Sequence, residues 1–188
     1  MKVKIIFMAL ILFSFIACGD EKENKEETNT EKVEKEVKFD KLIKFSLNIH
    51  KSDTPLEIKR ISEDNKNLEI TNNDKIVMFN FFTTWCPPCI AEIPYLNNLA
   101  QKYGENIRII GILLEEKTPE EIDKFISENN INYEIATGEN AFTFLKILGE
   151  INGIPYIALY DSEGKNINNY LGAVYQEMID IDIQKVIK

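Results

Sequence analysis

The sequence predicts an α/β fold with a central mixed sheet flanked by helices, and two observations predict it. Strand-like apolar runs alternate with helix-like segments from residue 42 onward, which is typical of this fold class. The run Lys75–Phe82 is almost continuously apolar, as expected of a central strand that is covered on both faces. Arg108–Leu114 and Tyr156–Tyr160 have the same character. We therefore expect a single domain over residues 42–188.

Two short strands are expected ahead of the central strand. Leu42–Ile49 and Leu56–Ile61 show near-alternating apolar residues, a pattern typical of strands with one buried face. They predict an N-terminal β-hairpin extension or an addition to the edge of the sheet. Near the other end of the domain, the turn residues Asp161–Gly164 separate Tyr156–Tyr160 from a further strand-like run, Asn166–Leu171.

Four segments predict helices. In Pro87–Tyr103, apolar residues recur at every third position from Ile90 and give one apolar stripe. Thr118–Glu121 is a capping box with proline at the first helical position, so we expect a helix that runs to about Asn129. The other two are Ala141–Leu148, which ends before Gly149, and the amphipathic segment Tyr175–Ile187.

Residues 1–17 are expected to be a signal peptide rather than part of the fold. Lys2 and Lys4 give a positive start, and the apolar stretch Ile5–Ala17 has 13 residues. That is short of the ~20 residues that span a bilayer as a helix. It is typical of the hydrophobic region of a signal peptide.

The apolar stretch ends in Phe15–Gly19, which resembles a bacterial lipoprotein cleavage site. The resemblance implies cleavage before Cys18, with lipid on the Cys18 thiol and on the new amino terminus. Several acyl chains would anchor the protein stably. Ordinary signal-peptide cleavage and an uncleaved anchor are the alternatives, because leucine is commoner than phenylalanine at the position of Phe15. Gly19, in place of aspartate, favours the outer membrane in bacteria that have two membranes.

A charged tether is expected between the lipid and the domain, over residues 18–41. Asp20–Lys41 holds nine acidic and six basic residues, and its aliphatic residues are Val33 and Val37. Such a segment cannot bury enough apolar surface to offset its ordering entropy, so we expect it to be disordered. A solvated single helix is the alternative.

The charge balance argues against nucleic acid as a partner. The chain has a net charge of −9, and without the two lysines of the signal peptide it has 20 basic against 31 acidic residues. The sequence therefore contains no basic patch that would neutralise phosphates.

The chemistry that the sequence predicts lies in the five residues Trp85–Cys89. Two thiols at this CxxC spacing, between a strand and a helix, are placed to form and break a disulfide with each other. Cys86 falls where the helix cap is expected, and the partial positive charge there favours its thiolate, the form that attacks a disulfide. Cys89 is within reach of a mixed disulfide formed at Cys86. We predict that Cys86 is the nucleophile and Cys89 the resolving thiol.

No metal and no separate cofactor is predicted, since the redox-active disulfide Cys86–Cys89 supplies the redox group. Tetrahedral zinc needs about four ligands. The chain has three cysteines, one of them assigned to lipid, and a single histidine, His50, which is expected at the surface. Haem attachment would need a histidine after Cys89, where Ile90 stands.

The segment Asn80–Cys89 resembles the active-site strand and helix of the thioredoxin superfamily, and within it the membrane-anchored thiol–disulfide oxidoreductases of the TlpA/ResA type. Gly153–Lys165 is similar to the cis-proline strand and following hairpin of these proteins. The resemblance covers residues 42–188, with Cys89 and Pro155 as its anchors. It implies a thioredoxin-like fold.

The resemblance also implies roles for single residues. Pro155 matches the cis-proline that packs against the CxxC motif and offers backbone to a substrate, and Ile154 would precede the cis bond; an edge-strand proline is the alternative. Glu92 matches an active-site glutamate that could accept the proton of Cys89 or raise its pKa; a solvated helix residue is the alternative. Asn80 stands where thioredoxins keep a buried aspartate. Because asparagine cannot titrate, that role must be absent or moved.

The docking surface for substrates is expected around the CxxC motif. Trp85, Pro87 and Pro88 lie within or beside the motif, and Ile154 precedes the cis-proline. Trp85 is also expected to shield the Cys86 thiol.

The function that the resemblance implies is reduction of disulfides in exported proteins by an enzyme anchored through lipid to a bacterial membrane and facing the periplasm or extracytoplasmic space. Apocytochrome c, whose haem-binding cysteines must be reduced, is a candidate client. A reductant on that side of the membrane needs electrons carried through it, so a membrane thiol-transfer protein is the implied donor.

Two other classes of function stay open at this point. A peroxiredoxin-like thiol peroxidase would share the fold, and Thr83 does precede Cys86 by three positions, but Phe79 stands where that class has proline. A non-catalytic thioredoxin-fold binding lipoprotein would only present a surface. The presence of both thiols argues against it.

Overall fold

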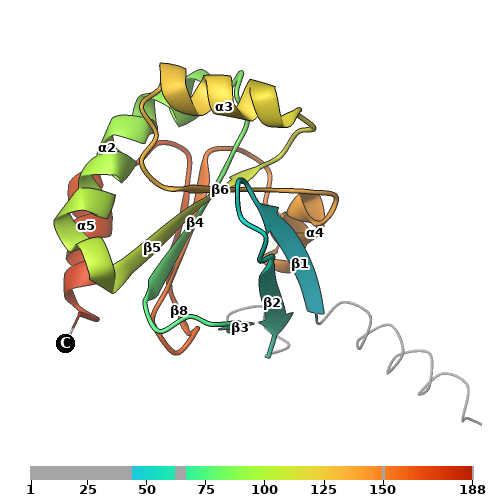
Figure 1. Ribbon diagram of the computed structural model, residues 1–188. Helices are drawn as coiled ribbons and strands as arrows, with labels where there is room; N and C mark the ends of the chain where they lie inside the picture. The colour runs from blue at the N-terminus through green and yellow to red at the C-terminus, as the bar shows by residue number, and fades with distance from the viewer. Residues whose placement is uncertain (1–43, 62–66, 150, 188) are drawn as a thin grey trace, which may run out of the picture.

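The computed structural model describes residues 44–61, 67–149 and 151–187, and within these ranges eight strands form one sheet. The sheet has the order β3-β2-β1-β6-β5-β4-β7-β8, with helices around it (Figure 1). The strands are β1 Lys44–Ile49, β2 Leu56–Arg60, β3 Leu68–Ile70, β4 Ile76–Phe82, β5 Ile107–Leu113, β6 Glu134–Thr137, β7 Tyr156–Tyr160 and β8 Asn166–Leu171. The helices are α2 Pro87–Tyr103, α3 Pro119–Glu128, α4 Asn140–Ile147 and α5 Gln176–Gln184, and a 3-10 turn, η1 Gly104–Asn106, follows α2.

Strand β4 is the central strand that the sequence predicts. It pairs in parallel with β5 and antiparallel with β7, so the predicted mixed sheet is confirmed. Each of its residues is buried, because both faces of the strand are covered. Successive side chains point to opposite faces. Phe79 and Phe81 therefore join one apolar cluster, while Met78 and Phe82 join clusters beneath α2.

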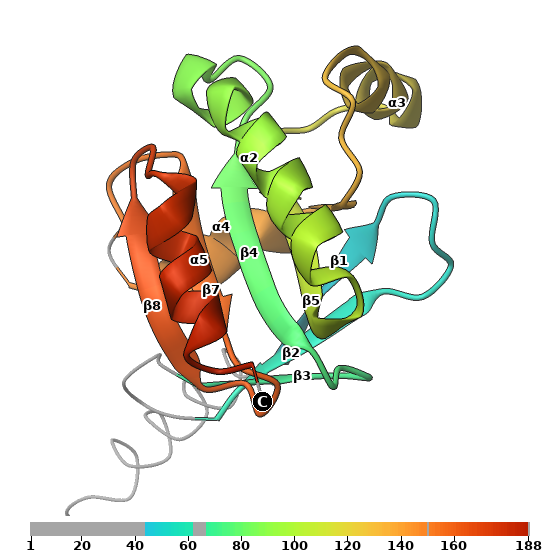
Figure 2. The same ribbon diagram turned by 90° about the vertical axis from the view of Figure 1, so that its left-hand side faces the viewer.

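The helices divide between the two faces of the sheet. Helices α2 and α5 pack against each other on one face, and α4 packs on the other face against β1 and β6 (Figure 2). The capping box of α3 is confirmed, since the Thr118 hydroxyl accepts from the Glu121 amide and the Glu121 side chain accepts from the Thr118 amide. Helix α5 ends earlier than predicted, because residues after Gln184 form only a terminal turn in which the amides of Val186 and Ile187 bond to the Ile183 carbonyl.

The predicted N-terminal hairpin is confirmed, and it belongs to the same sheet. Strands β1 and β2 pair antiparallel, and β1 also pairs with β6 where Asn48 lies opposite Thr137. The side chains of these strands bury an aromatic cluster against β4 and α4. Its centre is Phe144, whose ring lies 5.0 Å from Phe45 and 4.8 Å from Phe79.

Two strands were not expected from the sequence, β3 and β6. Both are short, with three and four residues, and β6 contains the charged Glu134. Strand β3 is held on one side by β2 and on the other by the β7–β8 turn, where the Leu68 amide donates to the Gly164 carbonyl at 2.8 Å. A side chain at Gly164 would not fit, since its Cβ would lie 1.8 Å from the Leu68 carbonyl oxygen.

The predicted signal peptide (1–17), the lipidation site Cys18 and the tether (18–41) lie outside the described residues. Among the residues that are described, no helix has both the length and the apolar character needed to span a bilayer.

Candidate active site

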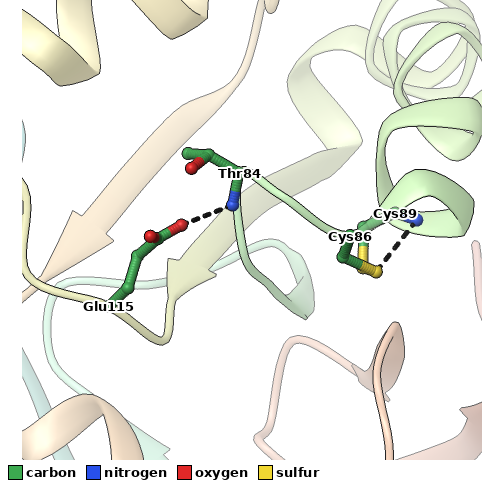
Figure 3. Close-up of a disulfide and its surroundings, with 4 residues drawn as sticks. All are labelled: Thr84, Cys86, Cys89 and Glu115. Atoms are coloured by element: carbon green, nitrogen blue, oxygen red, sulfur yellow. Dashed lines mark hydrogen bonds between the residues drawn. A yellow bond between two sulfur atoms is a disulfide. The ribbon is translucent and has the colours of Figure 1, made fainter.

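The two cysteines lie at the junction of β4 and α2. Cys86 is the N-cap of α2, with extended backbone angles, as the sequence predicts. Pro87 and Pro88 follow it and have no N–H to donate. The first amide of the helix that can reach the cap is therefore that of Cys89, which donates to the Cys86 Sγ at 3.3 Å (Figure 3).

Cys86 and Cys89 form a disulfide, so the structure shows the oxidised state. Both residues are buried, with exposed fractions of 4% and 1%. Neither cysteine is therefore open to solvent in this state. Both cysteines belong to an apolar cluster with Phe82 and Ile93, and Ile154 packs against that cluster.

The peptide bond between Ile154 and Pro155 is cis, as the resemblance implies. The alternative of an edge-strand proline is wrong, because Pro155 precedes β7, which pairs with β4 on one side and β8 on the other. The Pro155 carbonyl accepts from the Gly172 amide at 2.8 Å, which ties the proline segment to the end of β8. Ile154 thus lies between the cysteine cluster and this segment.

Glu92 lies on the buried side of α2 and has an exposed fraction of 3%. The alternative of a solvated helix residue is therefore wrong. Its Oε1 accepts from the Val174 amide at 2.9 Å. Its Oε2 has no hydrogen-bond partner in the described parts of the chain. Burial raises the pKa of Glu92 to about 6, against a smaller lowering effect of the Val174 amide. A carboxyl group with this pKa can gain or lose a proton near neutral pH.

Asn80 lies in the middle of β4, beside Gly111 of β5, and is buried. The Tyr133 ring lies close to Gly111, the residue of β5 that pairs with Asn80. Burial, and then the charge of Glu92, raise the pKa of Tyr133, so this phenol stays protonated. Asn80, Tyr133 and Glu92 therefore form a group of polar side chains beneath α2.

Glu115 contacts the loop that carries the nucleophile. Its carboxylate accepts a hydrogen bond from the Thr84 amide, two residues before Cys86 (Figure 3). Lys117 lies 3.8 Å from the other carboxylate oxygen. Glu115 follows the carboxyl end of β5, next to the end of β4 in the sheet. This contact fixes the loop between β4 and α2.

The predicted docking residues of the motif are exposed. Trp85 has an exposed fraction of 70%, and Pro87 and Pro88 are also exposed. Trp85 therefore presents most of its side chain to solvent, and its expected role in shielding the Cys86 thiol stays a prediction. Ile154, the fourth predicted docking residue, is only partly exposed.

No group of three or more histidine, cysteine, aspartate or glutamate side chains within 44–61, 67–149 and 151–187 is arranged to hold a metal ion. His50 is less exposed than expected, because its ring lies against α3 and its Nε2 is 2.7 Å from the Asp123 carboxylate.

Three contacts of the site were missed from the sequence: those of Glu115, Tyr133 and the Val174 amide. The contact of Glu115 could have been predicted from its place in the sequence, shortly after a predicted strand. Residues that follow the carboxyl ends of adjacent parallel strands meet at one edge of a sheet. Tyr133 precedes β6, which was itself not expected. A backbone amide such as that of Val174 leaves no signal in a sequence.

Comparisons with known proteins agree with this geometry. Residues 50–186, well over half of the chain, match the family model described as Redoxin. The chain belongs to the Redoxin family. Among its relatives, the thiol-disulfide oxidoreductase ResA of Bacillus cereus is 29% identical to this redoxin over 127 residues, which cover 65% of the redoxin and 70% of the relative.

A second relative and a solved structure support the same assignment. The thiol:disulfide interchange protein DsbE of Haemophilus influenzae is 30% identical over 128 residues, or 66% of this redoxin and 68% of the relative. The crystal structure of a thioredoxin-family thiol:disulfide interchange protein from Chlorobium tepidum matches with a TM-score of 0.58 and 22% identity, over 77% of this chain and 93% of that one. The thioredoxin-like fold and the TlpA/ResA type are thus confirmed, and this redoxin is a thiol–disulfide oxidoreductase.

Proposed function

We propose that this redoxin reduces disulfide bonds of exported proteins, with Cys86 as the nucleophile and Cys89 as the resolving thiol. The observation that carries the proposal is the bond between these two sulfurs at the amino end of α2. Two thiols that can form a disulfide with each other can donate two electrons to another disulfide. The resulting disulfide is returned to the dithiol form when it accepts two electrons from a donor.

The reaction runs in two exchange steps. The Cys86 thiolate attacks one sulfur of the client disulfide and displaces the other as a thiolate, which leaves a mixed disulfide. The Cys89 thiol then loses its proton, and its sulfur attacks the Cys86 sulfur. This step forms the bond seen in the structure and releases the client's second sulfur as a thiolate. The client gains two electrons, and the enzyme is left oxidised.

The helix terminus favours the attacking form of Cys86. The Cys89 amide donates to the Cys86 sulfur in the oxidised state. The same donor and the positive end of the helix would stabilise a thiolate at this position in the reduced state.

Glu92 is suited to accept the proton of Cys89. It lies three residues after Cys89, one helical turn away on the same side of α2. Its raised pKa, about 6, makes it a stronger base than an ordinary glutamate while it remains mostly ionised at pH 7.

Client binding is assigned to the surface around the motif. The exposed Trp85, Pro87 and Pro88 supply apolar contact area beside Cys86. Ile154 and Pro155 would offer backbone groups to an extended client segment, as the family resemblance implies. The packing of Ile154 against the cysteine cluster supports this role, because it places Ile154 and Pro155 near the cysteines.

We further propose that the enzyme works in the bacterial cell envelope, anchored by lipid on Cys18. The signal-like residues 1–17 and the cleavage-site pattern at Phe15–Gly19 support this location. A membrane thiol-transfer protein would return the enzyme to its reduced form. Clients would be exported proteins with accessible disulfides, and apocytochrome c is one candidate.

The experiment that tests the proposal is covalent trapping with Cys89→Ser. This variant should retain its client on Cys86 as a mixed disulfide that reducing agents release. The matched control is Cys86→Ser, which keeps Cys89 but should trap nothing. Equal trapping by both variants would refute the assignment of nucleophile and resolving thiol. Consumption of peroxide without reduction of a protein disulfide would instead favour the peroxidase.

A further inference from the structure

Two cavities adjoin at Phe142, an aromatic residue of α4 that is 53% exposed. The first has a volume of about 520 Å³ and extends over the segments that follow β5 and β6. The second has a volume of about 350 Å³ and extends over α4 to residues 149–152. Both volumes are in the range typical of binding pockets, about 300–1,000 Å³. We call the two cavities together the α4 groove.

The first cavity lies beside the loop that carries the nucleophile. It is lined by Leu113, the last residue of β5, which belongs to the same buried apolar cluster as Cys86 and Cys89. It is also lined by Glu115, whose carboxylate accepts a hydrogen bond from the Thr84 amide (Figure 3). A polypeptide segment in this cavity would therefore lie next to the reactive disulfide.

The second cavity leads to the cis-proline segment. It is lined by Ile151 and Asn152, which precede Ile154 by three and two positions. Ile154 in turn packs against the cysteine cluster. The α4 groove thus adjoins both segments that border the disulfide, and a client that reacts at Cys86 could place the adjoining part of its chain in the groove.

The surface of α4 in the groove offers an apolar contact. Side chains three and four positions apart lie on the same side of a helix. Leu145 and Lys146 follow Phe142 at these spacings, and all three line the second cavity. An apolar side chain of a client that covered the exposed part of Phe142 would remove apolar surface from water, which favours binding.

The first cavity has an excess of negative charge. Its charged residues are three glutamates and one lysine: Glu115, Glu116, Glu139 and Lys117. Lys117 already lies 3.8 Å from Glu115 and 3.3 Å from Glu121. Glu116 and Glu139 are exposed, and neither forms an ion pair with another residue of the described ranges. The groove therefore presents two carboxylates to any segment that enters it.

This charge discriminates among the possible occupants. The chain has a net charge of −9, so a second copy would bring more negative charge to a groove that is already acidic. An anionic membrane surface would be repelled in the same way. A basic segment of another protein would instead be attracted by both carboxylates.

We propose that the α4 groove binds the part of the client chain next to its reactive cysteine and selects basic segments that also carry an apolar side chain. The basic side chains pair with Glu116 and Glu139, and the apolar side chain packs on Phe142. The inference rests on the proposed function and names the class of client that the enzyme prefers. It changes the affinity for the client and adds no chemical step.

The test compares two cyclic peptides that differ only in the segment beside their single disulfide, which is Lys-Leu-Lys in one and Glu-Leu-Glu in the other. The reduced full-length protein in detergent is followed over one turnover at increasing peptide concentration. The half-saturating concentration should be about tenfold lower for the Lys-Leu-Lys peptide. The difference should largely disappear in 1 M salt, where charges are screened beyond about 3 Å.

Glu116→Lys should bring the two half-saturating concentrations together or reverse their order, because it replaces an attracting charge by a repelling one. A folding defect alone would impair the reduction of both peptides and leave their ratio unchanged. An unchanged ratio in this variant would therefore overturn the proposal.

Glu105→Lys is the matched control. Glu105 is also an exposed glutamate without an ion pair among the described residues, but it precedes the amino end of β5, whereas Glu116 follows the carboxyl end. The substitution changes the net charge by the same amount and should leave the ratio of the two peptides as in wild type. Equal effects of Glu105→Lys and Glu116→Lys would show that net charge alone is responsible, and the groove would have no role.

Phe142→Ala tests the apolar contact with a third peptide, in which serine replaces the leucine. The half-saturating concentration should rise about fivefold for the Lys-Leu-Lys peptide and less than about twofold for the Lys-Ser-Lys peptide. Equal changes for the two peptides would contradict packing of the leucine on Phe142.

The same measurements separate this inference from the function on which it rests. If wild type reduces the Lys-Leu-Lys and Glu-Leu-Glu peptides with equal half-saturating concentrations, the groove does not select clients, but the oxidoreductase function stands. If Glu116→Lys and Phe142→Ala change the sedimentation of the protein and leave the reduction of the peptides as in wild type, the groove binds a second copy and the proposal is wrong. Absence of client trapping by Cys89→Ser would count against the proposed function itself.

Discussion

The two faces of the sheet differ in the side chains that they bury, and β4 contributes side chains to both. Phe79 and Phe81 point to the face covered by α4, where they cluster with apolar side chains of the N-terminal strands and the Phe144 ring contacts both. Asn80 points to the α2 face, where the Asn80 Oδ1 and the Glu92 Oε2 are buried without hydrogen-bond partners among the described residues. Buried polar groups without partners lower stability.

This difference teaches where stability and reactivity lie in the molecule. The aromatic face supplies apolar burial and contains no group that reacts. The α2 face gives up part of that stability to keep a titratable carboxyl beneath a reactive disulfide. Substitutions on the two faces should therefore affect different measurements, and the predictions below test this separation.

The largest effect is expected at the nucleophile. Cys86→Ser removes the attacking sulfur, so disulfide reduction should fall by at least ~10³-fold. The melting temperature of the reduced variant should be close to that of the reduced wild type. The substitution replaces one sulfur atom by oxygen at an N-cap position, where serine is a favoured residue. Insulin reduction and thermal unfolding measure the two quantities. Residual activity above a tenth of wild type would show that Cys89 can attack on its own.

The opposite result is expected for Phe144→Ala on the aromatic face. The change removes a fully buried ring that contacts Phe45, Phe79 and Phe81. The free energy of unfolding should fall by about 3–5 kcal/mol. The rate of disulfide exchange per folded molecule should stay within about twofold of wild type at a temperature where the variant is folded. A loss of exchange rate as large as that of Glu92→Gln would contradict the separation of the two faces.

Glu92→Gln should separate activity from stability on the α2 face. Above pH 6 it should slow the resolving step by about 10²-fold, because the base is lost. Burial raises the Glu92 pKa from 4.5 to about 6. The folded protein therefore binds the proton more tightly than the unfolded chain, and wild type loses stability as pH rises from about 4.5 to 6.

The neutral Glu92→Gln side chain avoids this loss. The variant should be more stable than wild type by about 1–2 kcal/mol at pH 7 and show no gain at pH 4. Denaturant unfolding of the oxidised proteins at the two pH values measures it. A gain of equal size at both pH values would show that titration of Glu92 is not its cause.

The smallest effect is expected at Glu115. Glu115→Ala removes the acceptor of the Thr84 amide, so the free energy of unfolding should fall by about 1–2 kcal/mol. Glu115→Gln keeps an acceptor and should cost about half as much. The reaction of reduced Cys86 with a small aromatic disulfide should slow slightly in the alanine variant alone. Identical behaviour of the two variants would mean that the contact does not hold the loop.

Much of the fold could be predicted because its signals are local. The continuous apolar run of β4, the capping box at Thr118 and the proline after Cys86 each determine structure within a few residues. Strand β6 could not be predicted, because its four residues become a strand only by pairing with β5 and β1. Strand β3 likewise depends on contacts with distant residues.

The candidate site divides in the same way. The spacing of Cys86 and Cys89 identified the chemistry, and the family resemblance pointed to Glu92 and to the cis bond before Pro155. The apolar cluster around Cys86 could not be predicted, because it includes residues from distant segments such as Ile135, with Ile154 packed against it. Tyr133 was missed because its position over Gly111 is set by the pairing of β5 with β6.

The hydrogen bond between the Leu68 amide and the Gly164 carbonyl, called the clasp below, has a consequence for self-association. An exposed strand edge offers unpaired backbone groups to a second copy of a chain, which is a common start of aggregation. Here the outer side of β3 is engaged by the β7–β8 turn, through the Leu68 amide and the bridge between Asn67 and Lys165. Any side chain at Gly164 would force this clasp open. Glycine at that turn thus protects the border of the sheet against unwanted oligomers.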